Sequence, residues 1–323
     1  MKKNNLNSSF HFFDCLWDLW CIVSVIGIWP RFIEPNLIST TKLSLPIPNL
    51  PSELKNFRIL QFSDLHLHQG VPDFFLKKLI KKVRKLNPDL IVFTGDFLCF
   101  STSPDEARLK NLLHSFNAPY GCYAILGNHD YQQSVSIDEQ GNYDIVKKDS
   151  SLIGKGFKRL FTPINLSKYT TPEARVLESH HELIRLLEET PFQLLDNKTK
   201  TIPVKGTALN LCGVGEHMLS RCRPEEAFQG YDKNYPGIIL AHNPDCITSL
   251  HSYPGDVILC GHTHGGQVNL PWLWKKLIAL ENREFKRGLL RDGEKWIYVN
   301  RGIGSIIPFR WFSVPELLFL TLE

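Results

Sequence analysis

The chain has 323 residues, of which 43% are hydrophobic, enough apolar material for one large domain or two modest ones. It carries 37 Lys and Arg against 33 Asp and Glu, and the resulting charge of +4 gives no support for a nucleic-acid-binding protein. The eight cysteines form no C-x-x-C pair, so they indicate buried thiols in a reducing cytoplasm and no disulfide framework or cysteine-based metal site.

The amino-terminal segment, residues 1–32, is apolar and aromatic. It includes Trp17, Trp20 and Trp29. Asp14 and Asp18 interrupt it, and its longest apolar part, 19–29, is shorter than the about 20 residues that a membrane span needs. Because aromatic residues favour the membrane–water boundary, we interpret the segment as a membrane-surface anchor, with a core helix packed on the domain as the alternative. Whether residues 10–30 span the membrane or lie on it stays open.

Residues 33–56 predict a linker and an edge strand, because prolines punctuate an alternating pattern. Helices with one apolar side are then expected at 73–89 and 104–116. Strands are expected at 57–64, 90–96, 121–130, 209–215, 237–245, 256–266, 295–302 and 316–322. This βαβαβ order with continuous apolar strands predicts an α/β fold, in which buried sheets are covered by helices.

Polar side chains follow five of these strands. They are Asp64 with His66, Asp96, Asn128 with His129 and Asp130, His242, and His262 with His264. A single polar strand end is usually a turn, but the carboxyl ends of strands in α/β sheets also line the functional crevice. Five ends that combine carboxylates with imidazoles predict a site for Mn, Fe or Zn, and the absence of cysteine ligands disfavours structural zinc.

The first of these ends contains a third polar residue, His68, two positions beyond His66. Side chains two apart on a strand point the same way, so Asp64, His66 and His68 are expected to converge beyond the strand. Glycines before Asp96, Asn128 and His262 are expected to allow sharp turns.

These five blocks, in this order, resemble the calcineurin-like metallophosphoesterase family from about Ile59 to the carboxyl end. The resemblance implies a four-layer αββα sandwich, here over residues 57–323, with a two-metal centre at the strand ends. By position it assigns Asp64, His66 and His264 to the first metal, Asn128, His242 and His262 to the second, and Asp96 to both. Manganese is the expected ion, and a water shared by the two ions becomes the hydroxide that attacks phosphorus.

The same resemblance gives roles to the neighbouring residues. His129 is expected beside the metals, where it stabilises the transition state or protonates the leaving oxygen. Asp130 is expected to fix the tautomer of His129. Relatives often carry glycine at the position of His68, so this residue is either a substrate contact or a polar strand end.

An insert at about 131–179 departs from the generic family pattern, since other members have a short link there. Its segment 145–169 is both basic and apolar, and loops of this length inside compact domains are usually lids or disordered. We expect a lid that contacts phosphates and acyl chains, with an ordinary surface loop as the alternative. The expected substrate contacts are Lys155, Phe157, Lys158, Arg159 and Phe161.

The carboxyl-terminal half and the stretch "RFIEPNL" resemble the membrane-associated bacterial branch of the family, and the whole pattern is similar to its lipid A type. This implies hydrolysis of UDP-2,3-diacylglucosamine to 2,3-diacylglucosamine 1-phosphate and UMP, at the cytoplasmic face of the bacterial inner membrane and without an obligate protein partner. The alternative is a broad membrane-associated phosphodiesterase acting on another phospholipid or nucleotide diester. A metal-free scaffold should have lost ligands, whereas every ligand position is filled.

Overall fold

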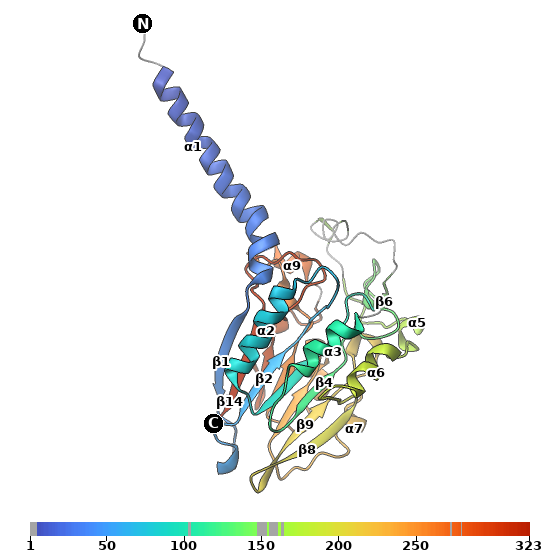
Figure 1. The fold of residues 1–323 in the computed structure, drawn as a ribbon. Coiled ribbons are helices and arrows are strands. Elements are labelled where there is room, and N and C mark those ends of the chain that lie inside the picture. Colours follow the sequence, from blue (N-terminus) through green and yellow to red (C-terminus); the bar gives the residue numbers. More distant parts are fainter. Residues whose placement is uncertain are drawn as a thin grey trace.

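The computed structural model describes residues 5–102, 105–146, 154, 161–162, 165–271, 273–278 and 280–323, with side chains from residue 13 onward. Its body contains stacked sheets with helices outside them, and one long helix projects from the body (Figure 1). All eight cysteines are free thiols.

The first sheet has six strands in the order β1-β14-β2-β3-β4-β7. Their bounds are β1 Ser39–Leu45, β14 Glu316–Leu322, β2 Arg58–Phe62, β3 Leu90–Thr94, β4 Cys122–Ile125 and β7 Phe192–Leu194. The strands β2, β3, β4 and β7 are parallel, while β14 is antiparallel to β2 and parallel to β1. Parallel neighbours need crossovers, which contain α2 (Asp73–Leu86), α3 (Glu106–His114) and α6 (His181–Glu188). The predicted edge strand is β1.

The second sheet also has six strands, in the order β12-β13-β11-β10-β9-β8. Their bounds are β12 Gly288–Asp292, β13 Lys295–Val299, β11 Val257–Cys260, β10 Gly237–Leu240, β9 Thr207–Gly213 and β8 Lys198–Val204. The four central strands are parallel, and the two edge strands are antiparallel to their neighbours. The short helices α7 (Pro224–Ala227) and α8 (Ile247–Leu250) lie in the crossovers on either side of β10.

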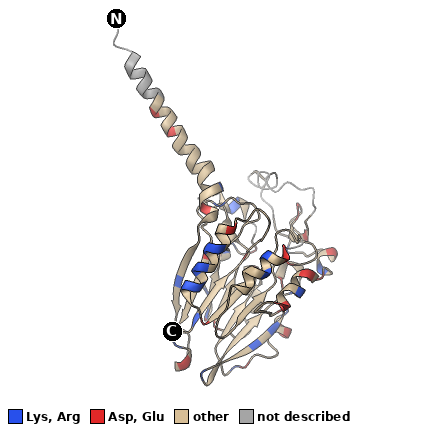
Figure 2. Ribbon diagram, in the orientation of Figure 1, with Lys and Arg blue, Asp and Glu red and all other residues tan. Residues whose placement is uncertain are grey.

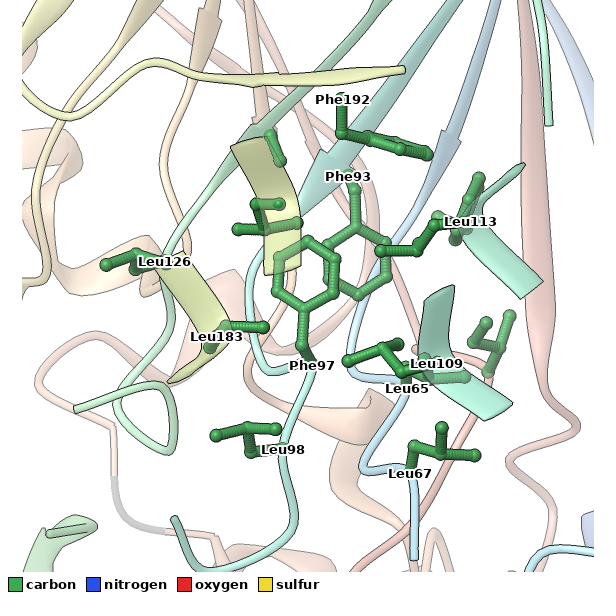
Figure 3. Close-up of a cluster of buried hydrophobic side chains, with 14 of the residues drawn as sticks. Leu65, Leu67, Phe93, Phe97, Leu98, Leu109, Leu113, Leu126, Leu183 and Phe192 are labelled. Atoms are coloured by element: carbon green, nitrogen blue, oxygen red, sulfur yellow. The ribbon is translucent and has the colours of Figure 1, made fainter. Parts of the chain in front are cut away.

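Three clusters of buried apolar side chains separate four layers. The first lies between the first sheet and its helices, where the rings of Phe93 and Phe97 are 4.0 Å apart and pack beside Leu109 of α3 and Leu183 of α6 (Figure 3). The second fills the space between the sheets, and the third covers the outer face of the second sheet under α7 and α8. The predicted αββα sandwich is therefore confirmed.

The helix α2 shows how the local pattern produces the layer. Its residues Phe75, Leu76, Leu79 and Val83 are buried, and its lysines and arginine lie on the opposite, solvent-exposed side (Figure 2). The helix ends at Leu86 because Asn87 adopts a left-handed conformation, with φ 47°.

The remaining turns are short. They are η3 Ser52–Leu54, η4 His217–Leu219, η5 Pro244–Cys246, η6 His264–Gly266, α9 Trp274–Leu277 and η7 Arg283–Lys286. In the insert, β5 (Val135–Ile137) pairs with β6 (Tyr143–Ile145), and α5 (Pro172–Arg175) follows. Buried Tyr143 donates a hydrogen bond of 2.8 Å to Glu281, which ties this hairpin to the domain.

The projecting helix consists of α1 (Asn5–Val23) and the wider π-helical η1 (Ser24–Ile33), and it ends in η2 (Glu34–Asn36). Its stretch Phe13–Asn36 has 24 residues, a mean hydropathy of 1.4 and only 6% of its most apolar window buried. This is long and apolar enough to cross a membrane by length and composition alone, a test that a signal sequence also passes.

Two sequence expectations about this segment change. The alternative of a core helix is wrong, because Phe13 and Trp17 are 68% and 66% exposed. The expectation that the segment is too short for a membrane span also changes, because the helix runs through Asp14 and Asp18 and its stretch Phe13–Asn36 has 24 residues. The segment is an exposed apolar helix with the length and composition of a membrane span.

Candidate metal centre

The candidate ligands gather where the carboxyl ends of parallel strands meet. The loops after β2, β3 and β4 of the first sheet face those after β10 and β11 of the second. Most of the side chains on these loops are buried, and His262 is half-buried. The buried ones are Asp64, His66, Asp96, Asn128, His129, Asp130, His242 and His264.

The backbone at these positions is unusual. Five of the seven candidate ligands have positive φ, and they are Asp64 (54°), His66 (44°), Asp96 (64°), His262 (70°) and His264 (50°). Each such conformation costs on the order of 1–3 kcal/mol and persists only where the surrounding structure enforces it, typically at functional sites.

This finding corrects the reasoning from strand alternation. The strand β2 ends at Phe62, so Asp64 and His66 converge through left-handed turns and not through the pleat of a strand. His68 lies away from the pair and lines a different cavity, and its Nδ1 accepts a hydrogen bond of 3.0 Å from Gly70.

The glycines act mainly by allowing close approach. Gly95 does have positive φ, 89°, as expected for a sharp turn. Gly127 and Gly261 do not, but a Cβ on Gly127 would lie 2.2 Å from Oδ1 of Asp96, and one on Gly261 would lie 1.9 Å from Oγ of Ser63. A side chain at either position would push the ligand loops apart.

The first ligand group consists of Asp64, His66 and His264. Nε2 of His66 lies 3.1 Å from Nε2 of His264, and Nε2 of His264 lies 3.7 Å from Oδ1 of Asp64. The Nδ1–H of His66 donates to the Leu98 carbonyl at 3.1 Å, which leaves the lone pair on Nε2.

The second group consists of Asn128, His242 and His262. Oδ1 of Asn128 lies 3.1 Å from Nε2 of His242 and 2.9 Å from Nδ1 of His262. The amide nitrogen of Asn128 donates to the Val135 carbonyl, and the Nδ1–H of His242 donates to the Thr94 carbonyl at 2.6 Å. Asn128 therefore presents its amide oxygen to the centre, and His242 presents Nε2.

Asp96 lies between the two groups. Its Oδ2 is 3.4 Å from Nε2 of His66 and 3.3 Å from Nε2 of His242. Its Oδ1 accepts from the backbone N–H of His129 at 2.9 Å. One carboxylate oxygen thus faces an imidazole of each group, which is the position that a shared ligand needs.

The electrostatics suit a cationic ligand. Burial lowers the pKa of His66 and of His262 to about 3, so both rings are neutral near pH 7. Burial opposes ionisation of Asp96, but the attraction of His242 and His129 nevertheless holds the pKa of this carboxyl well below its usual range. The same attraction to Asp96 raises the pKa of His242 in spite of its burial.

The chemistry of the donor set fits two divalent cations. Imidazole, amide and carboxylate acceptors lie within about 3–4 Å of one another, and acceptors at such distances repel unless a proton or a cation lies between them. Arg310 donates to Nδ1 of His264, so the proton of the neutral His264 ring sits on Nε2, facing the lone pair of His66. A cation bound at Nε2 would replace this proton.

His129 and Asp130 lie next to the ligands but do not interact as expected. Nδ1 of His129 accepts from the Phe100 backbone N–H at 3.2 Å, and this bond fixes the tautomer. The prediction that Asp130 fixes it is wrong, because the Asp130 carboxylate accepts from the backbone N–H groups of Asp96, Leu98 and Gly127 at 2.8–3.0 Å. Asp130 holds two ligand loops together.

A cavity of about 320 Å³ opens beside the centre. The polar residues that line it are Asp96, Asn128, His129, Ser136, His262, Thr263, His264 and Gln267. The apolar residues that line it are Ile137, Met218, Val268, Leu277, Ile278, Leu280, Ile306 and Ile307. Of the expected substrate contacts in the insert, Phe161 is 74% exposed, and Lys155, Phe157, Lys158 and Arg159 lie outside the described residues.

Three buried charged residues near the centre were not among the residues expected from the sequence: Glu216, Arg310 and Glu34. Glu216 follows β9, so the strand-end signal that found the other residues could have found it, and its negative charge helps to raise the pKa of His242. Arg310 and Glu34 carry no such signal, because their positions depend on contacts between segments far apart in the sequence.

Comparison with known proteins gives a consistent result. The model of the calcineurin-like phosphoesterase family matches residues 57–266. UDP-2,3-diacylglucosamine pyrophosphatase LpxG of Chlamydia muridarum is 41% identical over 91% of this chain and 92% of its own length. The protein of the same name from Chlamydia trachomatis serovar D is 39% identical with the same coverage. Phosphodiesterase YaeI of Escherichia coli is 27% identical over 82% of each chain.

Proposed function

We propose a substrate for this chain, which belongs to the calcineurin-like phosphoesterase family and is a hydrolase of that two-metal class. The proposed reaction is the hydrolysis of UDP-2,3-diacylglucosamine to 2,3-diacylglucosamine 1-phosphate and UMP. Water hydrolyses the phosphoanhydride. One P–O bond of the bridging oxygen breaks, and the phosphorus that loses the bridging oxygen gains the oxygen of water. The two protons of water pass to the products and the solvent.

The observation that carries the proposal is the mixed lining of the cavity beside the centre. Candidate ligands line the cavity together with eight apolar side chains, which we call the apolar wall and which include Ile306 and Ile307. Burying apolar surface stabilises a complex by about 25 cal/mol per Å², so this wall favours a substrate with hydrocarbon next to its phosphates over a fully polar nucleotide. The names of the two Chlamydia relatives support the same substrate.

Seven side chains would hold the ions in this proposal. Asp64, His66 and His264 would hold the first, Asn128, His242 and His262 the second, and Asp96 would contact both. The mixed oxygen and nitrogen donors are compatible with Mn²⁺, which we propose as the metal. When bound, such ions acidify water and neutralise charge on the phosphoryl oxygens.

His129 is the proposed acid. Its Nδ1 accepts from Phe100, so the proton of the neutral ring is on Nε2. The side chain lines the cavity, and burial lowers its pKa, so the ring is neutral and its Nε2–H can donate to a developing oxyanion. Asp130 supports this arrangement indirectly, by holding the backbone of Asp96 and Gly127.

The anchor and the insert complete the proposal. An apolar amino-terminal helix keeps the catalytic domain at the bilayer, where a diacylated substrate resides, and we place the domain at the cytoplasmic face of the inner membrane. The basic and apolar part of the insert, 145–169, remains the proposed lid over the substrate.

The second candidate is a broad membrane-associated phosphodiesterase. It is favoured by the similarity to the phosphodiesterase YaeI over 82% of the chain. The two candidates differ in their dependence on acyl chains, because only a lipid-specific enzyme should discriminate strongly against a substrate that cannot use the apolar wall.

The test compares three substrates with the full-length protein in detergent and Mn²⁺: UDP-2,3-diacylglucosamine, UDP-glucosamine and bis(p-nitrophenyl) phosphate. We expect UMP release from the diacylated substrate to exceed turnover of the other two by at least about 100-fold in kcat/KM, a difference of about 2.7 kcal/mol. An equal or faster reaction with the generic diester would favour the broad phosphodiesterase.

A further inference from the structure

The anchor helix is joined to the domain through a buried carboxylate, Glu34, which is 1% exposed. Its Oε2 accepts from the indole N–H of Trp29 at 2.8 Å and from the backbone N–H of Phe312 at 3.0 Å. Its Oε1 accepts from the backbone N–H of Ser313. A second contact at this junction is the bond of 2.8 Å from the Arg310 N–H to the Pro30 carbonyl.

The segment bound by the anchor, residues 310–313, is also bound to His264. The Ser313 hydroxyl donates to the carbonyl oxygen of His264 at 2.5 Å. The same segment also pairs with the residues that follow His264. The backbone N–H of Trp311 donates to the Gln267 carbonyl, and the Trp311 carbonyl accepts from the Asn269 N–H, both at 2.8 Å. The backbone of His264 is therefore held by a segment that the end of the anchor holds in turn.

The same segment braces Asp64 through the neighbouring loop. The guanidinium of buried Arg310 donates to the carbonyls of Arg301, Gly302 and Gly304. Gly304 in turn donates to the carbonyl of Asp64 at 2.6 Å. A Cβ on Gly302 would lie 2.7 Å from Cβ of Asp64, so this loop packs directly against the carboxylate.

These contacts are confined to one side of the centre. Within the described part of the chain, neither Glu34 nor residues 310–313 form a hydrogen bond with the second ligand group. Asn128 and His242 of that group are held by Val135 and Thr94, while His262 donates its backbone N–H to Asp64 of the first group. Disturbing the junction should therefore change the two candidate metal sites unequally.

We infer that Glu34 is a positioning residue for the metal site of Asp64, His66 and His264, so that the end of the membrane anchor is part of the scaffold of that site. The inference rests on the ligand set in the proposed function. Groups that orient metal ligands typically change metal affinity by about 10- to 100-fold when they are replaced.

The test is a titration of full-length protein in detergent with Mn²⁺, followed by calorimetry and by electron paramagnetic resonance of free Mn²⁺. Glu34→Gln keeps the size of the side chain but replaces one carboxylate oxygen by an amide N–H₂. This donor group would face N–H donors that now have an acceptor, so at least one of these hydrogen bonds is lost. Asp256→Asn is the matched control, because Asp256 accepts from the Gly237 N–H at 2.8 Å, at the amino-terminal edge of the second sheet and away from the centre.

We expect Glu34→Gln to weaken one Mn²⁺ site by about 10- to 100-fold and to leave the other within about twofold, while Asp256→Asn leaves both unchanged. If Glu34→Gln does not fold, Ser313→Ala removes only the bond to the His264 carbonyl and should weaken the same site. Wild-type affinity in these variants, or an equal loss in Asp256→Asn, would overturn the inference. Fewer than two Mn²⁺ in the wild type would contradict its ligand set, whereas missing UMP release would contradict only the proposed substrate.

Discussion

Replacing Asp130 by Asn tests the structural assignment of this residue directly. In the structure, Oδ2 accepts from the N–H groups of Asp96 and Gly127, and Oδ1 accepts from that of Leu98. An asparagine oxygen in place of Oδ2 could keep two of these bonds. Its amide N–H₂ would then face the buried N–H of Leu98, which would lose its acceptor.

The magnitude follows from these contacts. Burial and the charge of Asp96 raise the pKa of Asp130 to about 8. A hydrogen bond to its carboxyl contributes about 0.5–1.5 kcal/mol when the group is neutral and about 1.5–3 kcal/mol when it is charged, and a buried donor without an acceptor costs about 1–3 kcal/mol. We therefore expect Asp130→Asn to lower the free energy of unfolding by about 3 kcal/mol, and Asp130→Ala, which loses all three acceptors, by about 5 kcal/mol. For a domain of this size the first value corresponds to a fall in Tm of roughly 6–12 °C.

The assay is urea unfolding of the full-length protein with chelator present, so that metal binding does not contribute. Asp138→Asn is the control, because Asp138 also accepts from two backbone N–H groups, but in a half-exposed turn, and should change stability by less than about 1 kcal/mol. A variant Asp130→Asn that lost turnover at unchanged stability would refute the reasoning and restore the role in fixing the tautomer of His129.

Four further outcomes are expected. Asp96→Ala should bind less than one Mn²⁺ per chain by elemental analysis and lose about 10³-fold or more in kcat, and near-normal turnover would contradict a shared ligand. His129→Gln should keep both ions but lower kcat about 10²- to 10⁴-fold, whereas lost metal would reassign it as a ligand. Leu79→Ala should lower the free energy of unfolding by about 2–5 kcal/mol in urea, and a smaller loss would mean that the cluster under α2 repacks. Burial opposes both shifts, but His217, Lys168 and Tyr143 together hold the pKa of Glu281 at about 2, and Glu281 raises the pKa of His217. The Tm lost in Glu281→Gln should therefore be largest between the ordinary values of 4.5 and 6.5, shrink below 4.5, and shrink only in part above 6.5, where the pairing with Lys168 remains; a loss independent of pH would contradict this.

Elements with strong local patterns could be predicted from the sequence. The helix α2 and the apolar strands β2, β3 and β14 appear where periodicity and apolar runs place them. The short edge strands β7, β8 and β12 were not predicted, because their residues are largely polar or half-exposed and their pairing depends on neighbours distant in the chain.

The composition of the centre could also be predicted, but not its local geometry. The strand-end pattern brought together the seven candidate ligands, which the structure places within a few ångströms of one another. The turns at Asp64 and His66 depend on the Gly302–Gly304 loop packed against them, so no local pattern could separate His68 from the pair. For the same reason the partners of Asp130 could not be deduced from its place beside His129.

The most direct test of the account is anomalous scattering from a crystal of the full-length protein grown with Mn²⁺. The account predicts two peaks, one contacted by Asp64, His66 and His264 and the other by Asn128, His242 and His262, with the carboxylate of Asp96 reaching both. A single peak, or two peaks outside these side chains, would contradict it.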